Sequence, residues 1–326
     1  MTEFTFITAN DIHISDSGPQ GRIDDFKSAM LDKLSQMAMA CSKLKADAAI
    51  IAGDLYNIKN PAKNTHKLNR ELIEVFKTFP CPIYMIEGNH DLTANNIGSL
   101  EEQPLGVLFA DKTLIQLRHE VIQKGDCKIS LVGIPFTEGL EPSTLVLPDK
   151  EDYSAQICVM HLFAVLKSGN MFGERLYGYD ELVRLPADIF VLGHYHIDQG
   201  IYESEGKYFI NIGSMSRGTL AEESIDHSPQ IGLIKIAVNQ GKTEYNIKAL
   251  KLKVRPAKEV FDLVKKEEQQ KQKEEIQIFV DKLATEAVKE TVESAKTIDD
   301  VIDAMGLVKV IKDRVVHFIQ EALAQK

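Results

Sequence analysis

Five short apolar runs, each ending in aspartate, asparagine or histidine, constrain the fold of this chain more than any other feature. The runs cover residues 4–9, 48–52, 82–86, 157–160 and 189–192. Each is apolar throughout, which is typical of strands covered on both faces of a sheet. In open α/β sheets, binding sites form at the carboxyl ends of strands. The polar residues that follow these runs are therefore predicted to meet at one edge of a sheet.

These strand ends carry residues with metal-binding chemistry. For a single polar turn of this kind, a binding site and side chains that merely hydrogen-bond their own backbone are equally good explanations. Five such ends together are hard to explain by packing, because burying so many polar groups without a cation is costly. The set comprises Asp11, His13, Asp54, Asn89, His90, His161, His194 and His196.

The ligand types predict the kind of ion and the reaction. Carboxylate, amide and imidazole ligands suit hard or borderline divalent ions, with Mn²⁺ preferred here and Fe²⁺, Zn²⁺ or Mg²⁺ as alternatives. Seven candidate ligands are too many for one ion, so we expect two ions roughly 3.5–4 Å apart, bridged by one carboxylate. Such a pair binds phosphate oxygens and activates water as hydroxide. Phosphate-ester hydrolysis is the reaction that this arrangement favours.

The order of the predicted elements indicates an α/β fold. Helices over 24–45 and 65–79 alternate with the first three strands, and this order implies a parallel sheet with right-handed crossovers. The remaining predicted elements are strands over 114–117 and 128–133, a short helix over 180–185, and strands over 207–212, 231–238 and 244–253 that close a second sheet. The expected architecture is a two-sheet sandwich flanked by helices, with a helical C-terminal tail.

Charge and cysteine content limit the partners and the location. The formal charge is −10, so nucleic acid binding would need a local basic patch, metal ions or a partner. The four cysteines show no paired short spacing, which favours free thiols inside a cell. Neither a signal peptide nor a membrane span is expected, so a cytoplasmic location without a membrane partner is predicted.

Composition changes at Arg255-Pro256, which predicts a catalytic domain over 1–255 and a helical module over 256–326. Within the module, the charged run 265–275 is expected to be a solvated helix or linker. Apolar stripes at helical spacing follow over 276–288 and 298–323. Either these stripes pack on each other or on the main domain, or they dock on a partner.

The ordered motifs Asp-x-His, Gly-Asp, Gly-Asn-His-Asp, a single His and Gly-His-x-His resemble those of the calcineurin-like metallophosphoesterase superfamily. They span residues 11 to 196. The resemblance implies two ligand sets that share Asp54: Asp11, His13, Asp54 and His196 for one ion, and Asp54, Asn89, His161 and His194 for the other. It also implies that His90 contacts the scissile phosphate and assists the leaving oxygen, while Asp91 orients the turn.

Within that superfamily, the chain is most similar to SbcD-type DNA repair nucleases, in stretches 10–13, 51–56, 86–91, 192–196, 211–214 and 253–256. This similarity implies manganese-dependent exonuclease or endonuclease activity on DNA, in repair or recombination. The implied partners are DNA and an SbcC-like coiled-coil ATPase held by the C-terminal helices, with a homodimer as a further assembly.

Two features depart from that family. Asn57 stands where some relatives have a second functional histidine, three residues after the bridging aspartate. Only 70 residues follow Pro256, where the family usually carries a DNA-facing capping domain. Two alternatives stay open: a stand-alone phosphoesterase acting on nucleotides, cyclic nucleotides or phosphoproteins, and a structural subunit without turnover. The acidic charge favours the first alternative, and the intact ligand set argues against the second.

Overall fold

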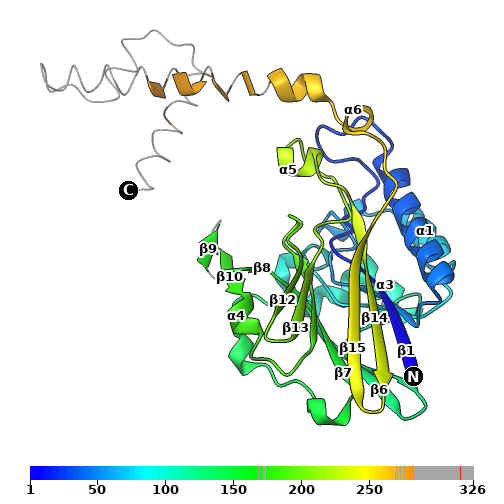
Figure 1. Ribbon diagram of the computed structural model, residues 1–326. Helices are drawn as coiled ribbons and strands as arrows, with labels where there is room; N and C mark the ends of the chain where they lie inside the picture. The colour runs from blue at the N-terminus through cyan, green and yellow to red at the C-terminus, as the bar shows by residue number, and fades with distance from the viewer. Residues whose placement is uncertain are drawn as a thin grey trace, which may run out of the picture. The chain divides into compact units, whose positions relative to one another are not determined.

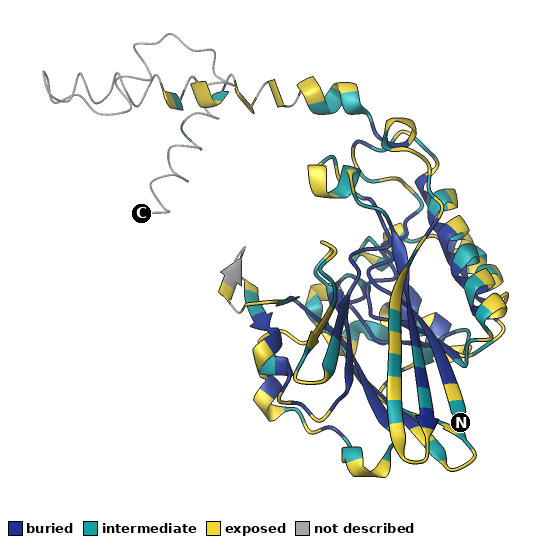
Figure 2. Ribbon diagram, viewed as in Figure 1, coloured by how far each residue is buried: buried dark blue, intermediate teal, exposed yellow. Residues whose placement is uncertain are grey.

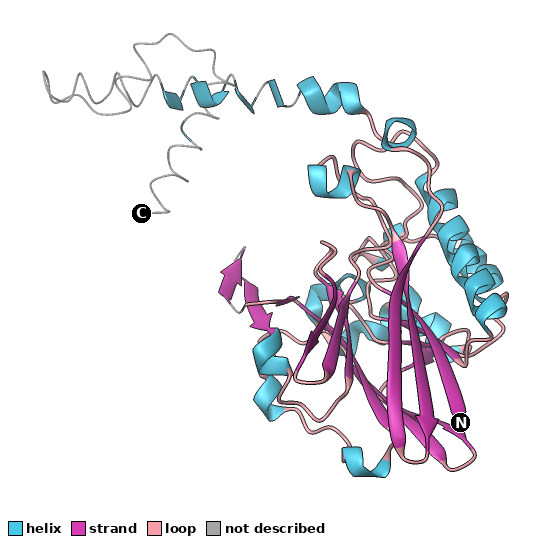
Figure 3. Ribbon diagram, in the orientation of Figure 1, coloured by secondary structure: helices cyan, strands magenta, loops and turns pink. Residues whose placement is uncertain are grey.

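The computed structural model describes residues 1–281 except 168, 172, 173, 269, 272, 275 and 279, together with residue 316. The chain divides into two compact units, Met1–Asp262 and Leu263–Lys326. The first unit confirms the predicted fold class, because two mixed six-stranded sheets form a sandwich with helices on the outside (Figures 1 and 3).

The first sheet has a parallel centre and an antiparallel edge. Its strands β1 to β4 are parallel, whereas β14 pairs antiparallel with β1 and β15 pairs antiparallel with β14. In spatial order the strands are β15 (Lys242–Lys251), β14 (Gln230–Asn239), β1 (Thr2–Ala9), β2 (Ala48–Ile51), β3 (Ile83–Met85) and β4 (Ile115–Gln116).

The second sheet has a similar design, with parallel strands β13, β11, β7 and β6 between two antiparallel edges. Its spatial order is β12 (Gly200–Ser204), β13 (Lys207–Asn211), β11 (Ile189–His194), β7 (Ala155–Leu162), β6 (Cys127–Ile134) and β5 (His119–Lys124). A small three-stranded sheet is formed by β8 (Ala164–Val165), β10 (Glu174–Gly178) and β9 (Gly169–Met171).

Six α-helices lie within the first unit as described: α1 (Phe26–Leu44), α2 (His66–Phe76), α3 (Pro104–Ala110), α4 (Tyr179–Leu182), α5 (Glu222–Ile225) and α6 (Ala257–Val260). The two long ones begin where side chains can cap them. Asp25 accepts a hydrogen bond from the Ser28 N–H at 3.0 Å, and Thr65 accepts one from the Leu68 N–H at 3.1 Å. Across the described residues, no helix is both long and apolar enough to traverse a bilayer.

Apolar layers hold the sandwich together. Between the sheets, Phe4 and Ile50 of the first pack with Ile157 and Val191 of the second, and all four are fully buried. The buried strand faces are dark blue in Figure 2. Helices α1 and α2 cover the outer face of the first sheet, and α4 covers that of the second. The strands are therefore covered on both faces, as their continuous apolar sequences require.

The structure corrects the predicted position of the last two strands. β14 and β15 extend the first sheet, where Thr2 pairs with Val238, and do not close the second. Their alternating pattern defines a buried face but not a neighbour, and the neighbour is the edge of β1 opposite β2. The elements that were not predicted are the strands β5, β8, β9, β10 and β12 and the helices α3 and α5. Of the second unit, residues 263–281 are described with four gaps and are helical. Most of the two predicted apolar stripes lies outside the described residues.

Candidate metal centre

The polar residues predicted to meet do lie at one edge of the two sheets. Asp11 and His13 follow β1, Asp54 follows β2, and Asn89 lies in a 3₁₀ turn (Asn89–Asp91) after β3. From the second sheet, His161 lies in β7, His194 ends β11 and His196 follows it. Because these parallel strands all end at the same edge, residues up to 185 positions apart in sequence become neighbours.

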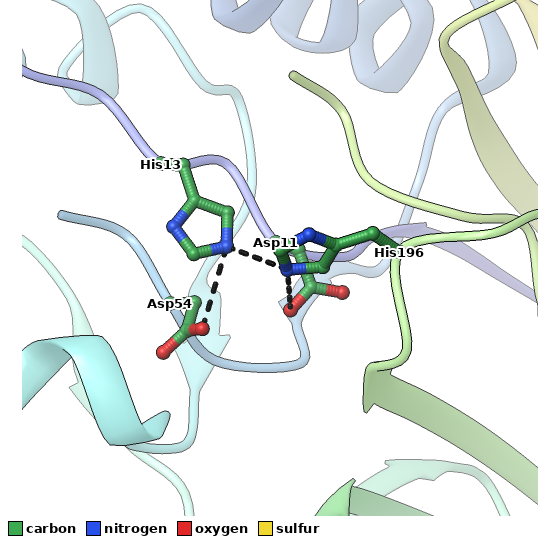
Figure 4. A group of neighbouring side chains, drawn as sticks. All are labelled: Asp11, His13, Asp54 and His196. Carbon is green, nitrogen blue, oxygen red and sulfur yellow. Dashed lines mark hydrogen bonds and ion pairs between the residues drawn. The ribbon is translucent and has the colours of Figure 1, made fainter. Parts of the chain in front are cut away.

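One group consists of Asp11, His13, Asp54 and His196 (Figure 4), each offering a ligand atom within 4.8 Å of the others. The Nε2 atoms of His13 and His196 lie 2.9 Å apart. His13 Nε2 is 3.4 Å from Asp54 Oδ2, and His196 Nε2 is 3.9 Å from Asp11 Oδ1. All four side chains thus direct nitrogen or oxygen atoms toward a common point.

A second group consists of Asp54, His161 and His194, again with ligand atoms within 4.8 Å of one another. His161 Nε2 lies 3.5 Å from Asp54 Oδ2. The amide oxygen of Asn89 is 3.2 Å from His161 Nε2 and 3.0 Å from His194 Nδ1. Asp54 belongs to both groups, so its carboxylate is placed to bridge two cations.

The donor set fits divalent cations. His161 Nδ1 donates to the Ala52 carbonyl oxygen at 2.7 Å, which directs Nε2 into the cluster as a potential ligand atom. The Nε2 atoms of His13 and His196 face each other, so both can bind the same cation. Buried His13 Nδ1 has no hydrogen-bond partner among the described residues. Nitrogen and oxygen ligands without cysteine suit Mn²⁺, Fe²⁺ or Zn²⁺.

The amide of Asn89 has two possible orientations. Hydrogen bonding alone would favour the reversed amide, whose NH₂ would donate to Asp54, His194 and His161. The oxygen instead faces the two imidazoles, as a metal ligand would. In the reversed amide the oxygen would accept from Lys59 Nζ at 3.3 Å. The choice between the two orientations depends on whether a cation is bound.

Four of the seven predicted ligands have an unusual backbone conformation. The φ angle is 48° at Asp11, 51° at His13, 54° at Asp54 and 86° at His194. Residues other than glycine rarely adopt positive φ, and such strain gathers at functional sites where surrounding contacts enforce it. Here the His194 N–H donates to both oxygens of Asp11, at 2.9 and 3.1 Å, and the His13 N–H donates to the Asp54 carbonyl oxygen at 2.9 Å.

Burial and neighbouring charges shift the pKa values of the candidate ligands. Burial raises the pKa of Asp11 to about 7 and lowers the pKa of His196 to about 4. Burial would also raise the pKa of Asp54, but nearby His161 and His13 hold it well below its ordinary value. Conversely, burial opposes protonation of His161, yet the charge of Asp54 raises the pKa of His161 to about 9. Protons therefore partly occupy a site whose ligands bind metal in deprotonated form.

Glycine is required where the loops approach most closely. A Cβ atom on Gly88 would lie 2.1 Å from Asp54 Oδ1 and 2.4 Å from the Asp54 backbone nitrogen. Only glycine allows the turn after β3 to pack directly against the shared carboxylate. The Gly-Asn-His-Asp sequence therefore combines a ligand, Asn89, with the one residue that lets this ligand approach Asp54.

His90 and Asp91, predicted to be catalytic, lie beside both ligand groups but in neither. His90 Nδ1 lies 2.8 Å from the Asn57 carbonyl oxygen, which can only accept, so Nδ1 carries the proton and Nε2 is left for a substrate. Asp91 accepts from the backbone N–H of Tyr56 at 3.1 Å and of Gly88 at 3.0 Å. Asp91 therefore ties the turn to the loop after β2.

A match to known families decides the identity of the fold and centre. Residues 4–198 match the family model described as "Calcineurin-like phosphoesterase". The chain belongs to this family. It is therefore a phosphate-ester hydrolase by family, and the two ligand groups are candidates for the two divalent metals typical of such enzymes.

This phosphoesterase is similar to the "DNA double-strand break repair protein Mre11" of Archaeoglobus fulgidus. The two are 24% identical over 220 residues, which cover 62% of this chain and 47% of that protein. The chain thus spans about half the length of the curated relative that it matches.

Solved structures with a similar fold include a 5'-nucleotidase precursor from Thermus thermophilus, with TM-score 0.47 and 13% identity, covering 77% of this chain and 55% of that one. A dimetal phosphatase from Danio rerio has TM-score 0.46 and 12% identity, and the match covers 77% of this chain and 99% of that one. Vacuolar protein sorting 29 from Cryptosporidium parvum has TM-score 0.34 and 17% identity, and the match covers 77% of this chain and 100% of that one.

The phosphoesterase site includes residues that the sequence motifs did not indicate. A cavity of about 410 Å³ is lined by His13, His90 and His196, and also by Asn57 and His227. His227 belongs to none of the motifs, and its Nε2 donates to the Ser214 carbonyl oxygen at 2.6 Å. Asn57 is the position that departs from the family pattern. It contacts His90 through its backbone carbonyl oxygen and not through its side chain.

On the other side of the centre, Glu174 Oε2 lies 2.9 Å from His194 Nε2. Phe136 lies near His194, with ring centroids 5.5 Å apart. Phe136 follows β6 at the same sheet edge, but a search for polar residues at strand ends does not select a phenylalanine. No motif in the sequence around Glu174 indicates that it belongs to the site. Glu174 begins β10 and contacts His194 only in the folded chain.

Proposed function

We propose that this phosphoesterase hydrolyses phosphodiester bonds of DNA as the nuclease subunit of a repair or recombination complex. The observation that carries hydrolysis is that two ligand groups share Asp54 while His90 lies beside both. The choice of DNA is supported by the similarity to the repair protein Mre11. It is also supported by the SbcD-like stretches of the sequence.

In the proposed reaction, Asp11, His13, Asp54 and His196 would hold one cation, and Asp54, Asn89, His161 and His194 would hold the other. Bound divalent cations supply Lewis-acid chemistry, neutralising phosphate charge and lowering the pKa of water. We prefer Mn²⁺, with Fe²⁺, Zn²⁺ or Mg²⁺ as alternatives, because the ligands combine imidazole with oxygen donors.

The protein's own residues position and transfer protons. His90 Nδ1–H is held by the Asn57 carbonyl oxygen, which aims the ring at the substrate. In the protonated form, Nε2–H contacts the scissile phosphate. The water oxygen forms a bond to phosphorus and the bond from phosphorus to the leaving oxygen breaks, while Nε2 gives its proton to the leaving oxygen. The proton lost by the water passes to solvent, from which His90 is protonated again. Asp91 keeps the turn in place through two backbone N–H groups.

The C-terminal module is proposed to dock on an SbcC-like coiled-coil ATPase. Apolar residues at helical spacing over 276–288 and 298–323 would supply the docking face. The charged run 265–275 would act as the tether between this face and the catalytic unit.

Incubation of the purified full-length protein with linear DNA tests the substrate. We expect hydrolysis of single- or double-stranded DNA to exceed that of phosphoserine peptides, small monoesters and cyclic nucleotides, and to depend on Mn²⁺ more than on Mg²⁺. A coexpressed ATPase is added in a parallel reaction. The His90→Asn protein, purified in the same way, controls for contaminating nucleases. Hydrolysis of cyclic nucleotides without any of DNA would favour the stand-alone phosphoesterase instead.

A further inference from the structure

A second cavity, of about 470 Å³, lies outside the metal centre. It is lined by the start of α1, by Arg217 and by residues 253–255 after β15. Five basic side chains line it (Arg22, Lys33, Arg217, Lys253 and Arg255) against three acidic ones (Asp24, Asp25 and Asp32). A cavity with excess positive charge is unexpected in a chain of formal charge −10.

The acidic residues of this cavity are already engaged. Asp24 pairs with Arg22 through two hydrogen bonds of 2.8 and 2.7 Å, and both side chains are only 2% exposed. Asp25 caps α1 by accepting from the backbone N–H and hydroxyl of Ser28. Asp32 accepts from Gln36 Nε2 at 2.8 Å. Among the described residues, only Asp24 of these three forms an ion pair, with Arg22, and the five basic residues of the lining still outnumber its three carboxylates.

Arg217 is a buried cation without a carboxylate partner among the described residues. The residue is 5% exposed, and its guanidinium lies over the ring of Phe261 at 5.7 Å. One nitrogen, Nη2, donates to the Arg255 carbonyl oxygen at 2.7 Å, whereas buried Nε has no acceptor in the part of the chain that the structure describes. A buried cation without a carboxylate partner is costly, so a bound anion near Arg217 would lower this cost.

Lys33 is a second buried basic residue. It is 3% exposed, and its Nζ donates to the Met215 carbonyl oxygen at 2.7 Å. Burial, together with nearby Arg22 and Arg217, lowers the pKa of Lys33 to about 7. The side chains of Arg22, Lys33 and Arg217 are thus buried basic groups of the lining, whereas Lys253 and Arg255 are exposed.

We propose that this cavity binds a phosphate group. A tetrahedral dianion would pair with the guanidinium of Arg217, which lines the cavity, and would compensate the excess positive charge, because arginine forks recognise phosphate oxygens well. The exposed heads of Lys253 and Arg255 would complete the contacts from the solvent side. The phosphate is either a free phosphate or phosphomonoester, or a backbone phosphate of a nucleic acid strand. The proposal does not depend on DNA being the substrate of the metal centre.

A ligand here would act on the loop beside the metal centre. Arg217 lies between Ser216 and Gly218, which line the catalytic cavity. In the same loop, the Ser214 hydroxyl donates to the Asp11 carbonyl oxygen at 2.7 Å. Arg22 Nη1 donates to the Arg217 carbonyl oxygen at 2.5 Å. A phosphate bound to Arg217 would therefore restrict the movement of this loop, which contacts the turn that carries Asp11.

Calorimetric titration of inorganic phosphate into the full-length protein tests the site. The protein is dialysed against EDTA, so that cations in the metal centre do not contribute. We expect saturable binding that Arg217→Gln and Arg255→Gln each weaken at least tenfold. Arg70→Gln, an exposed arginine on α2 outside the cavity, serves as the matched control and should bind as the unaltered protein does. Lys253→Gln and Arg255→Gln, at exposed positions, keep the test valid if Arg217→Gln does not fold.

Competition identifies the source of the phosphate. An oligodeoxynucleotide without terminal phosphates is added to the phosphate-loaded protein. Displacement of phosphate supports the site and identifies backbone phosphate as its ligand, whereas retention supports it as a site for free phosphate or a phosphomonoester. Absence of phosphate binding by the unaltered protein, or equal binding by all cavity variants, overturns the proposal. Neither result bears on DNA hydrolysis, which is measured separately at the metal centre.

Discussion

The backbone N–H of His90 donates to Asp54 Oδ1 at 2.7 Å, so the carboxylate shared by both ligand groups also positions the turn that carries His90. This bond comes from the backbone and is independent of the imidazole. A substitution of the His90 side chain therefore leaves the shared carboxylate oriented, whereas a substitution of Asp54 disturbs the ligands and His90 together. The two residues can be separated by experiment for this reason.

His90→Asn should lower hydrolysis at least about 100-fold, the usual range for loss of a general acid, while both metals stay bound. Asp54→Ala should lose metal as well as turnover, because it removes the bridge between the two groups. Metal content by elemental analysis, measured beside turnover on the same samples, checks both variants. A His90→Asn protein that loses both ions would make His90 a ligand and contradict the assignment.

Gly88→Ala should disrupt the metal centre, because its Cβ would fall 2.1 Å from Asp54 Oδ1. The added methyl group must displace either the shared carboxylate or the turn that carries Asn89. Gly169→Ala is a suitable control, since the nearest atom to its Cβ would be Leu176 Cδ1 at 3.8 Å. We expect reduced metal content for Gly88→Ala and normal content for Gly169→Ala. Equal metal content in the two variants would show that the close approach is dispensable.

The catalytic unit should fold without the C-terminal module if truncation leaves Phe261 in place. Phe261 is 1% exposed, and its ring lies under Arg22 and Arg217 at 5.2 and 5.7 Å. A protein ending at Asp262 should unfold cooperatively and retain its metal. Phe261→Ala in the protein ending at Asp262 should lower the free energy of unfolding by about 3–5 kcal/mol, the cost of truncating a buried phenylalanine. Denaturant unfolding compares the two proteins, and equal midpoints would show that the Phe261 ring does not stabilise this unit.

Loss of binding to a coexpressed ATPase by the protein ending at Asp262 would support docking through the C-terminal module. Phe318→Glu in the full-length chain should weaken the same complex, because it places a charge in an apolar contact. Co-purification measures both. Retention of normal binding by the truncated protein would exclude the module as the docking element.

Lys33 should make stability depend on pH above neutrality. Its pKa is about 7 in the folded protein, against 10.5 when exposed. Between these values the unfolded chain binds more protons, so the free energy of unfolding should rise with pH by up to about 1.4 kcal/mol per unit. Below pH 7 the full cost of the buried charge is present. Asp24, Asp32, Arg22 and Arg217 are the charged groups that face Lys33.

Lys33→Met removes this titration and should therefore be more stable than the unaltered protein at pH 7, with a difference that shrinks toward pH 10. Urea unfolding at several pH values, in buffers without phosphate, measures the difference. A constant difference across this range would mean that Lys33 has an ordinary pKa in the folded state.

The sequence by itself determined the ligand types and the strands that carry them. Continuous apolar runs before Asp11, Asp54, Asn89, His161 and His194 predict strands covered on both faces, and parallel strands end at one edge. The helices α1 and α2 were also predictable, from their apolar spacing of three and four residues. Local patterns are sufficient here because each depends only on which face of an element is buried.

Only the tertiary structure decided which edges pair and which side chains meet outside the motifs. β14 lies beside β1 because an unpaired strand edge was available there, and no local pattern in residues 230–239 encodes that neighbour. The positive φ angles of Asp11, His13 and His194 are held by hydrogen bonds between distant loops. Arg217, Lys33 and Arg255 form one basic cavity only because α1, the loop after β13 and the segment after β15 converge. Such contacts join residues that are far apart in the sequence and form only in the folded chain. Local sequence periodicity therefore does not predict them.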